Sequence, residues 1–196
     1  MIFVTGSRGK LASATRYLAC TGIQLGQVDL QLDEIQDLSV RNIALRKAWD
    51  AYRILRGPLF IEDGGFYIDE LGGFPGPFAK YVVQTVGPAG ILRLADMTAS
   101  RTAHFESALV YVDHTGACQV FLDSSQTGTV ALAASAERHP DAWSPIWDVW
   151  VPDGYDVPLA ALSDLQLARR AELQAPRSVF GQFAAWLAAS EQHRGI

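Results

Sequence analysis

Cysteines are scarce in this sequence, and no secretory signal is visible at its start. The chain has 196 residues and two cysteines, Cys20 and Cys118, which have neither metal-site spacing nor a redox motif. We therefore expect two buried thiols in a reducing environment. The first residues enter a strand-like run, Ile2–Val4, with no basic region or cleavage site before it. These features predict a cytoplasmic protein.

Positive charge and long apolar runs are also scarce. Lysine and arginine together number 16 against 21 aspartates and glutamates, so the formal net charge is −5. A chain without a strong basic field is not expected to gather nucleic acid. Its apolar runs are broken well short of the length that crosses a bilayer. We expect neither nucleic acid nor a membrane as partner, whereas a small polyanion held by a few cations and a metal ion is compatible with this balance.

The order of apolar patterns predicts an α/β protein with one domain, residues 1–196, without internal repeats or a linker. Ser39 is a plausible N-cap for a helix that Gly57 and Pro58 would stop. We expect strands at 2–4, 26–32, 59–61, 102–112 and 118–122, and helices at 11–18, 39–56, 78–95 (split near Gly87) and from 177 onward.

The stretch from 57 to 77 has the densest polar chemistry. Its apolar strand is followed by two adjacent carboxylates, Glu62 and Asp63, and then by Gly64 and Gly65, which predict a tight turn. Carboxylates at the carboxyl end of a buried strand lie where open α/β sheets place ligands. The alternative is a strand end with a solvated acidic turn.

A second polar turn follows the first strand. Thr5, Gly6, Ser7 and Arg8 lead into Lys10 and a helix, which would offer backbone N–H groups, hydroxyls and positive charge to a phosphate. The spacing is not that of a P-loop. Many similar turns bind nothing, so this signal is weak by itself.

Lys47 lies within the apolar stripe of the helix at 39–56. A lysine there either extends its ammonium group to solvent or faces inward toward a partner charge. The sequence leaves both alternatives open.

Three predicted strand ends thus carry polar residues: the turn from Thr5 to Lys10, then Glu34, then Glu62 and Asp63. Parallel strands would bring them to one edge of a sheet, where carboxylates could hold Mg²⁺ and lysines could face phosphates. This arrangement suits metal-assisted attack of water on a phosphoanhydride. No serine or cysteine stands in a recognisable nucleophile motif.

The sequence resembles the inosine triphosphate pyrophosphatase family, the Ham1/RdgB-like enzymes. The resemblance is carried, in family order, by Phe3–Leu11, Glu34–Gln36, Ala44–Ala48, Glu62–Phe66 continuing through Leu71–Lys80, and Pro152–Tyr155. It implies the ITPase-like (Maf/Ham1-like) α/β fold, with a long mixed sheet and helices forming two lobes around a central cleft. It also implies a homodimer and Mg²⁺-dependent conversion of a nucleoside triphosphate to the monophosphate and pyrophosphate.

The resemblance also implies roles for particular residues. Thr5, Gly6, Ser7, Arg8 and Lys10 would grip the triphosphate, and Lys47 would bind phosphate. Glu34 and Asp63 would hold the metal ion, with Asp63 also positioning or activating water; Lys10, Lys47 and Asp63 form the implied catalytic set.

Several positions depart from the family pattern. Ser7 replaces an asparagine, and Gly64 replaces the serine or threonine after the acidic pair. In the segment that would read the base, Trp147 stands at the position of the family's aspartate if the sequences are aligned without a gap. Asp148 stands there if one residue is deleted. Of the Ser-His-Arg motif near the C-terminal helix only Arg177 remains.

These departures predict a pyrophosphatase whose base selectivity differs from the deaminated purines of the family, because rebuilt hydrogen-bonding groups change discrimination. The alternative is a catalytically silent homologue that binds nucleotides or has a structural role.

Overall fold

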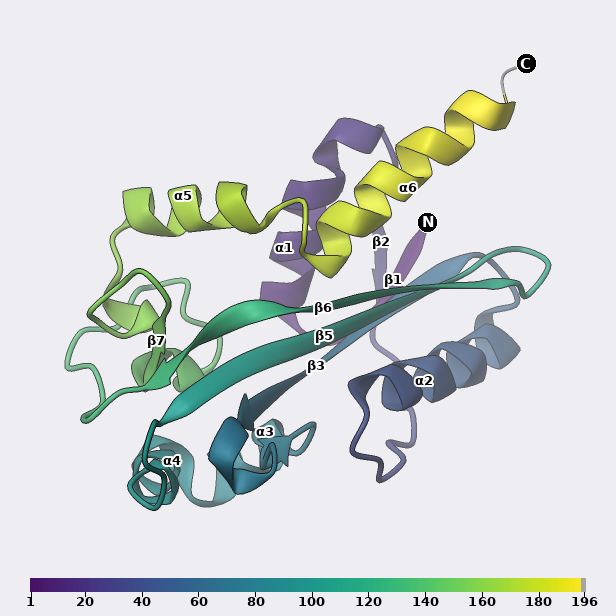
Figure 1. Ribbon diagram of the computed structural model, residues 1–196. Coiled ribbons are helices and arrows are strands. Elements are labelled where there is room, and N and C mark those ends of the chain that lie inside the picture. Colours follow the sequence, from purple (N-terminus) through teal and green to yellow (C-terminus); the bar gives the residue numbers. More distant parts are fainter. Residues whose placement is uncertain (195–196) are drawn as a thin grey trace. The chain divides into compact units, whose positions relative to one another are not determined.

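The computed structural model describes residues 1–194 and has a mixed α/β fold with a long mixed sheet, as predicted (Figure 1). The strands are β1 (Ile2–Val4), β2 (Gly26–Val28), β3 (Leu59–Ile68), β4 (Pro75–Gly76), β5 (Thr102–Val112), β6 (Cys118–Val130) and β7 (Trp150–Pro152). The α-helices are α1 (Arg8–Leu18), α2 (Val40–Leu55), α3 (Ala79–Thr85), α4 (Gly87–Ala95), α5 (Asp164–Gln174) and α6 (Val179–Arg194). Four short 3₁₀ turns are η1 (Ala19–Thr21), η2 (Asp69–Leu71), η3 (Pro145–Asp148) and η4 (Leu159–Ala161).

The sheet contains both parallel and antiparallel pairs. Its strands follow the order β2-β1-β3-β5-β6-β7, and β4 pairs with β3. Strand β1 runs parallel to both β2 and β3, whereas β3–β4 and β6–β7 are antiparallel. The parallel part therefore brings the ends of β1 and β2 beside the stretch of β3 that follows Phe60, where Glu62 and Asp63 lie.

The chain divides into two compact units. The first consists of residues 1–63, 107–123 and 174–196, and the second of residues 64–106 and 124–173. The prediction of one domain without a separate linker, with two lobes around a cleft, stays a prediction.

The core of the first unit is built on aromatic rings. Phe3 and Phe60 are register partners on β1 and β3, and their rings stack with centroids 4.4 Å apart. Helix α6 packs against α1 and adds Phe180 and Phe183 to this core, with Phe183 fully buried. The apolar face predicted for the C-terminal helix is confirmed. It fixes the start of α1 relative to β3, which matters for the charged residues described below.

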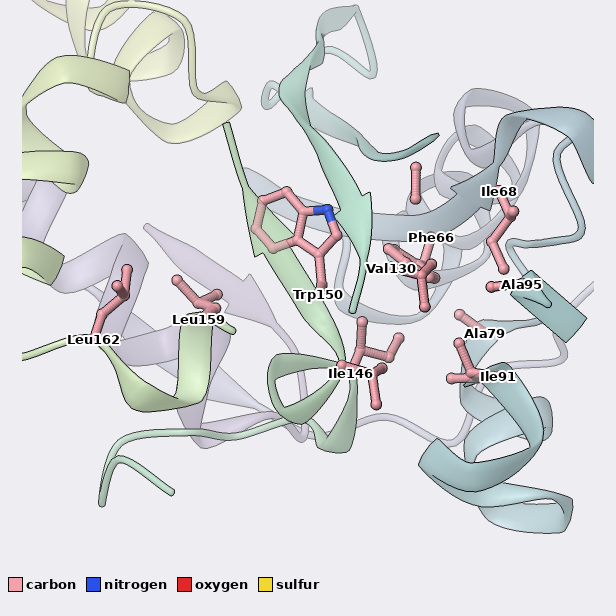
Figure 2. Close-up of a cluster of buried hydrophobic side chains, with 12 residues drawn as sticks. Phe66, Ile68, Ala79, Ile91, Ala95, Val130, Ile146, Trp150, Leu159 and Leu162 are labelled. Carbon is pink, nitrogen blue, oxygen red and sulfur yellow. The ribbon is translucent and has the colours of Figure 1, made fainter. Parts of the chain in front are cut away.

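The core of the second unit surrounds Trp150, which is fully buried on β7 (Figure 2). The ring of Phe105 meets that of Trp150 edge-on at 4.8 Å. Ile146, from η3, belongs to the same cluster. The buried side chain of Ile146 thereby anchors the segment that is expected to read the base.

The turn predicted at Gly64 and Gly65 is wrong, because β3 continues through both residues to Ile68. A Cβ atom on Gly65 would lie 2.8 Å from the carbonyl carbon of Gly76 on the paired strand β4. Glycine is required here by the close approach of two backbones inside a sheet and not by a change in chain direction.

Other boundaries are partly confirmed. Helix α2 begins after Ser39, whose hydroxyl accepts a hydrogen bond from the N–H of Asn42 at 3.4 Å, and it ends at a left-handed Arg56. The strand predicted at 26–32 ends at Val28, and the one predicted at 118–122 extends to Val130.

The prediction of buried thiols is also wrong. Cys20 and Cys118 are both exposed, because one lies in the short turn η1 after α1 and the other begins β6 at a hairpin. Within residues 1–194, no helix combines the length and the apolar character that a membrane crossing requires.

Candidate active site

Five charged side chains from four segments of the first unit lie together. They are Lys10 on α1, Lys47 on α2, Glu62 and Asp63 on β3, and Glu34 in the loop after β2. The pairing of β1 with both β2 and β3 brings these segments to one place, although Glu62 and Asp63 lie inside β3 and not, as predicted, at the end of a strand. Lys10 contacts Glu62, and Lys47 contacts both Glu34 and Asp63.

Lys10 is held by a single residue of β3. Its Nζ donates a hydrogen bond to the backbone carbonyl of Glu62 at 3.0 Å and lies 2.9 Å from Glu62 Oε2. The Glu62 side chain is only 7% exposed, and this lysine compensates its charge. Burial alone would lower the pKa of Lys10, but the nearby carboxylates, Glu62 foremost, raise it above the ordinary lysine value.

Lys47 bridges the other two acids. Its Nζ donates hydrogen bonds to Glu34 Oε1 at 2.5 Å and to Asp63 Oδ2 at 2.6 Å. The lysine side chain is 16% exposed, so it faces the acids and does not extend into solvent. Burial would lower its pKa, but the charge of Asp63 and the hydrogen bonds to Asp63 and Glu34 raise it.

The turn between β1 and α1 has an internal hydrogen-bond pattern of its own. The Ser7 N–H donates to Thr5 Oγ1 at 3.1 Å, and the Ser7 hydroxyl caps α1 by accepting from the Lys10 N–H at 3.3 Å. Arg8 is the exposed first residue of the helix. A Cβ atom on Gly6 would lie 2.8 Å from Asp29 Oδ2, so glycine makes room for that carboxylate. The start of α1 can bind an anion through its first N–H groups.

The charges of this cluster do not favour a polyanion by themselves. Two ammonium groups against three carboxylates leave a formal charge of −1. A triphosphate binding here therefore requires a further cation.

The residues present fit a hard divalent cation. Glu34 Oε1 and Asp63 Oδ2 converge on one positively charged atom, the Lys47 Nζ, and oxygen ligands are those that Mg²⁺ prefers. Across residues 1–190, whose side chains the structure describes, no group of three or more histidine, cysteine, aspartate or glutamate side chains is arranged to hold a metal ion. Two carboxylates would have to be completed by water and substrate oxygens, as is common for Mg²⁺.

Trp147 and Asp148 lie in η3, which belongs to the second unit, whereas the residues of the charged cluster belong to the first. Asp148 Oδ2 is 2.5 Å from Arg138 Nη1, and Arg138 Nη2 donates to the carbonyl of Ala142 at 3.0 Å. Asp148 Oδ1 is buried and has no hydrogen-bond partner among residues 1–190. One oxygen of this carboxylate is thus fixed by arginine and the other still requires a donor.

The remaining predicted site residues have less distinctive surroundings. Gly64 is an intermediate-exposure residue inside β3 and begins the second unit. Arg177 is exposed in the turn before α6 in the first unit, and its N–H donates to the carbonyl of Gln174 at 2.9 Å. The ion pairs that hold the charged cluster together do not include Arg177.

The sequence placed Glu62 only among the carboxylates that could hold Mg²⁺ and gave Arg138 no role, although each holds a predicted site residue. For Glu62 a signal existed: adjacent residues of a strand point to opposite faces, so two neighbouring acids should find different partners. For Arg138 there was none, because it lies in an irregular polar loop.

Known proteins share the sequence pattern and the fold of this chain. Residues 1–166 match the sequence profile of the Ham1 family. The chain is 30% identical over 186 residues to the dITP/XTP pyrophosphatase of Methanopyrus kandleri, covering 95% of each chain. It is 33% identical over 167 residues to the dITP/XTP pyrophosphatase of Methanothermobacter marburgensis, covering 85% of this chain and 86% of the relative.

Solved structures show the same fold. The Ham1 protein of Staphylococcus aureus superimposes with a TM-score of 0.76 at 16% identity, covering 96% of this chain and 98% of that one. The dITP/XTP pyrophosphatase of Mycobacterium abscessus superimposes with a TM-score of 0.70 at 21% identity, covering 89% and 92%.

Proposed function

The chain belongs to the Ham1 family, and we propose that it is a hydrolase that converts a nucleoside triphosphate to the monophosphate and pyrophosphate. Relatives that align with most of the chain are dITP/XTP pyrophosphatases. The observation that carries the proposal is the contact of Lys47 with both Glu34 and Asp63 beside the Lys10–Glu62 pair. These are the groups that anhydride hydrolysis requires, namely cations for phosphate oxygens and carboxylates for metal and water.

The triphosphate would be gripped at the start of α1. Thr5, Gly6, Ser7 and Arg8 supply backbone N–H groups, hydroxyls and one guanidinium, and Lys10 supplies an ammonium group fixed by Glu62. Lys47 adds a second ammonium group. Such preorganised donors stabilise the charge that develops on phosphate oxygens as the anhydride bond breaks.

Asp63 is the residue best suited to move a proton. Its carboxylate would orient a water molecule and accept its proton while the water oxygen forms a bond to phosphorus and the bond to the pyrophosphate leaving group breaks. Glu34 and Asp63 would hold Mg²⁺, which when bound neutralises phosphate charge and makes water more acidic. The lysines then remain charged throughout, because their pKa values are raised.

We further propose that base selectivity is altered relative to dITP and XTP. The residues in the base-reading segment are Ser144, Pro145, Ile146, Trp147 and Asp148, with the carboxylate of Asp148 bound by Arg138. A buried acceptor that lacks a donor, such as Asp148 Oδ1, favours a base that presents an N–H group. Trp147 offers an aromatic face for stacking.

We also infer a homodimer and a cytoplasmic location from the family resemblance. Sedimentation velocity checks the first, and microscopy of the tagged protein in its own cells checks the second. A monomer at micromolar concentration would contradict the dimer.

The test of the proposed function is a panel of nucleoside triphosphates, including dITP, XTP, dGTP and dCTP, incubated with the protein and Mg²⁺. The expected products are the monophosphate and pyrophosphate, resolved by phosphorus NMR, and the reaction should stop when the metal is chelated. Release of orthophosphate would mean that a different anhydride bond is cleaved. Inertness toward the whole panel, with nucleotide binding intact by calorimetry, would favour the silent homologue.

A further inference from the structure

We propose that Lys47 is an exchangeable counter-ion that occupies the place of the metal ion between Glu34 and Asp63 until a triphosphate draws it away. This inference rests on the proposed function, because it concerns the same carboxylates and the same phosphates. It predicts that metal binds weakly to the protein alone and that substrate and metal assist each other.

The geometry supports direct competition. The Lys47 Nζ contacts one oxygen of Glu34 and one of Asp63, which are the two carboxylates available to a cation here. An ammonium group and a hard divalent cation seek the same oxygen ligands, so both cannot occupy the same contacts. Metal entry therefore requires Lys47 to release at least one carboxylate.

Burial makes the release costly without a new partner. The side chains of Lys47 and Asp63 are each 16% exposed, so a lysine that leaves these acids must find other acceptors. Phosphate oxygens of a bound triphosphate would be such acceptors. Because coupling between two ligands is reciprocal, a triphosphate that engages Lys47 strengthens metal binding, and metal strengthens triphosphate binding to the same degree.

Lys10 provides the internal contrast. Its ion pair and its side-chain hydrogen bond are both with Glu62, and the charges of Asp63 and Glu34 also act on it. Removing its charge changes the field at the cluster but vacates no predicted metal ligand. Lys47 and Lys10 thus separate direct exchange from a general effect of charge.

The experiment measures Mn²⁺ affinity of the full chain by calorimetry, without nucleotide or phosphate. The Lys47→Met variant should bind Mn²⁺ at least about tenfold more tightly than the wild type, because it removes a unit charge in contact with both ligands. Lys10→Met should give a clearly smaller gain. Arg46→Met, on the same helix but paired with Asp50, should bind like the wild type. Equal gains for Lys47→Met and Lys10→Met, or no gain at all, would overturn the exchange.

A second measurement needs no loss of the lysine. In the wild type, the Lys47 side-chain ammonium signal in nitrogen-15 NMR, assigned through Lys47→Arg, should shift as Mg²⁺ is added, and that of Lys10 should change less. An unchanged Lys47 signal at metal saturation would overturn the proposal even if Lys47→Met does not fold. Turnover of the nucleotide panel by the wild type is scored separately, so failure of the proposed function and failure of the exchange are distinguishable.

Discussion

The two units treat charge differently. In the first, two lysines and three acids from four segments pair at distances of 2.5 to 3.0 Å. Glu62 Oε2 is buried without a hydrogen bond among residues 1–190, but the Lys10 ammonium group lies 2.9 Å from it and compensates its charge. In the second, the carboxylate of Asp148, in the segment proposed to read the base, has one oxygen on Arg138 and one buried oxygen without a hydrogen bond among residues 1–190. The first arrangement suits phosphate and metal whatever base is attached. The second depends on a few hydrogen bonds, and such a site can change its preference without disturbing the anhydride chemistry.

The largest loss of activity is expected from Asp63→Asn, which removes the proposed proton acceptor and one proposed metal ligand from the first unit. We expect turnover to fall at least about a hundredfold on every substrate, the usual contribution of a general base. Steady-state measurement of pyrophosphate release checks this. Asp50→Asn, which alters a half-buried acid that pairs with Arg46 on α2, outside the charged cluster, is the control and should retain activity. Parent-like turnover by Asp63→Asn would remove this residue from the chemistry.

The next largest loss of activity is expected from a change at Glu62, the partner of Lys10. Glu62→Gln keeps the shape of the side chain but removes the charge that positions Lys10. We expect kcat/KM to fall by about tenfold, since a hydrogen bond to a charged group is worth about 1.5–3 kcal/mol. The loss should be equal for all bases, because Lys10 is proposed to contact phosphate. A loss confined to one base would break the comparison between the units.

A smaller effect, and one of a different kind, is expected in the second unit. Arg138→Met releases Asp148 Oδ2, so the carboxylate gains a free acceptor and a new orientation. We expect the ratio of kcat/KM for dITP to that for dGTP to change by about tenfold, the range that one hydrogen bond to a base provides. Arg93→Met, on α4 of the same unit, is the matched control. If all substrates lose activity equally, Arg138 supports folding and not base choice.

The smallest effect is on folding stability, which should depend on pH differently in the two units. In the first unit the pKa values of Lys10 and Lys47 are raised, so their stabilisation is full below the ordinary value of 10.5 and is lost as pH rises through the raised values. In the second, hydrogen bonds from Ser100 and the Ala99 N–H lower the pKa of Glu70. Its stabilisation is present above 4.5 and is lost as pH falls through the lowered value.

Thermal melting checks this contrast. Glu70→Gln should lower the melting temperature at neutral pH, and the difference from the wild type should shrink below pH 4.5. Lys47→Met should behave in the opposite sense, with its difference shrinking only above pH 10.5. Glu172→Gln, on the exposed surface of α5, is the control. A Glu70→Gln difference that persists in acid would contradict the assignment.

Local signals allowed much of the fold to be predicted. The Ser39 cap predicted the start of α2, and the apolar stripe of α6 predicted its buried face. Glycine, in contrast, is ambiguous in sequence: Gly64 and Gly65 suggest a turn, but the close approach of β4 to β3 makes them part of a strand. The cysteines misled because small size indicates burial only on average, and both lie at element ends.

The contacts of the candidate site were likewise predictable only in part. Lys47 was detectable because a cation in an apolar stripe requires a partner, and its partners are Glu34 and Asp63. The contact between Arg138 and Asp148 was not predictable, because the loop that carries Arg138 has no periodicity that fixes where its side chains point.

The most direct test of this division of labour compares kcat/KM for dITP and dGTP in the wild type, Glu62→Gln and Arg138→Met. Glu62→Gln should lower both values by the same factor, and Arg138→Met should change their ratio. A changed ratio in Glu62→Gln, together with an unchanged ratio in Arg138→Met, would contradict this division of labour.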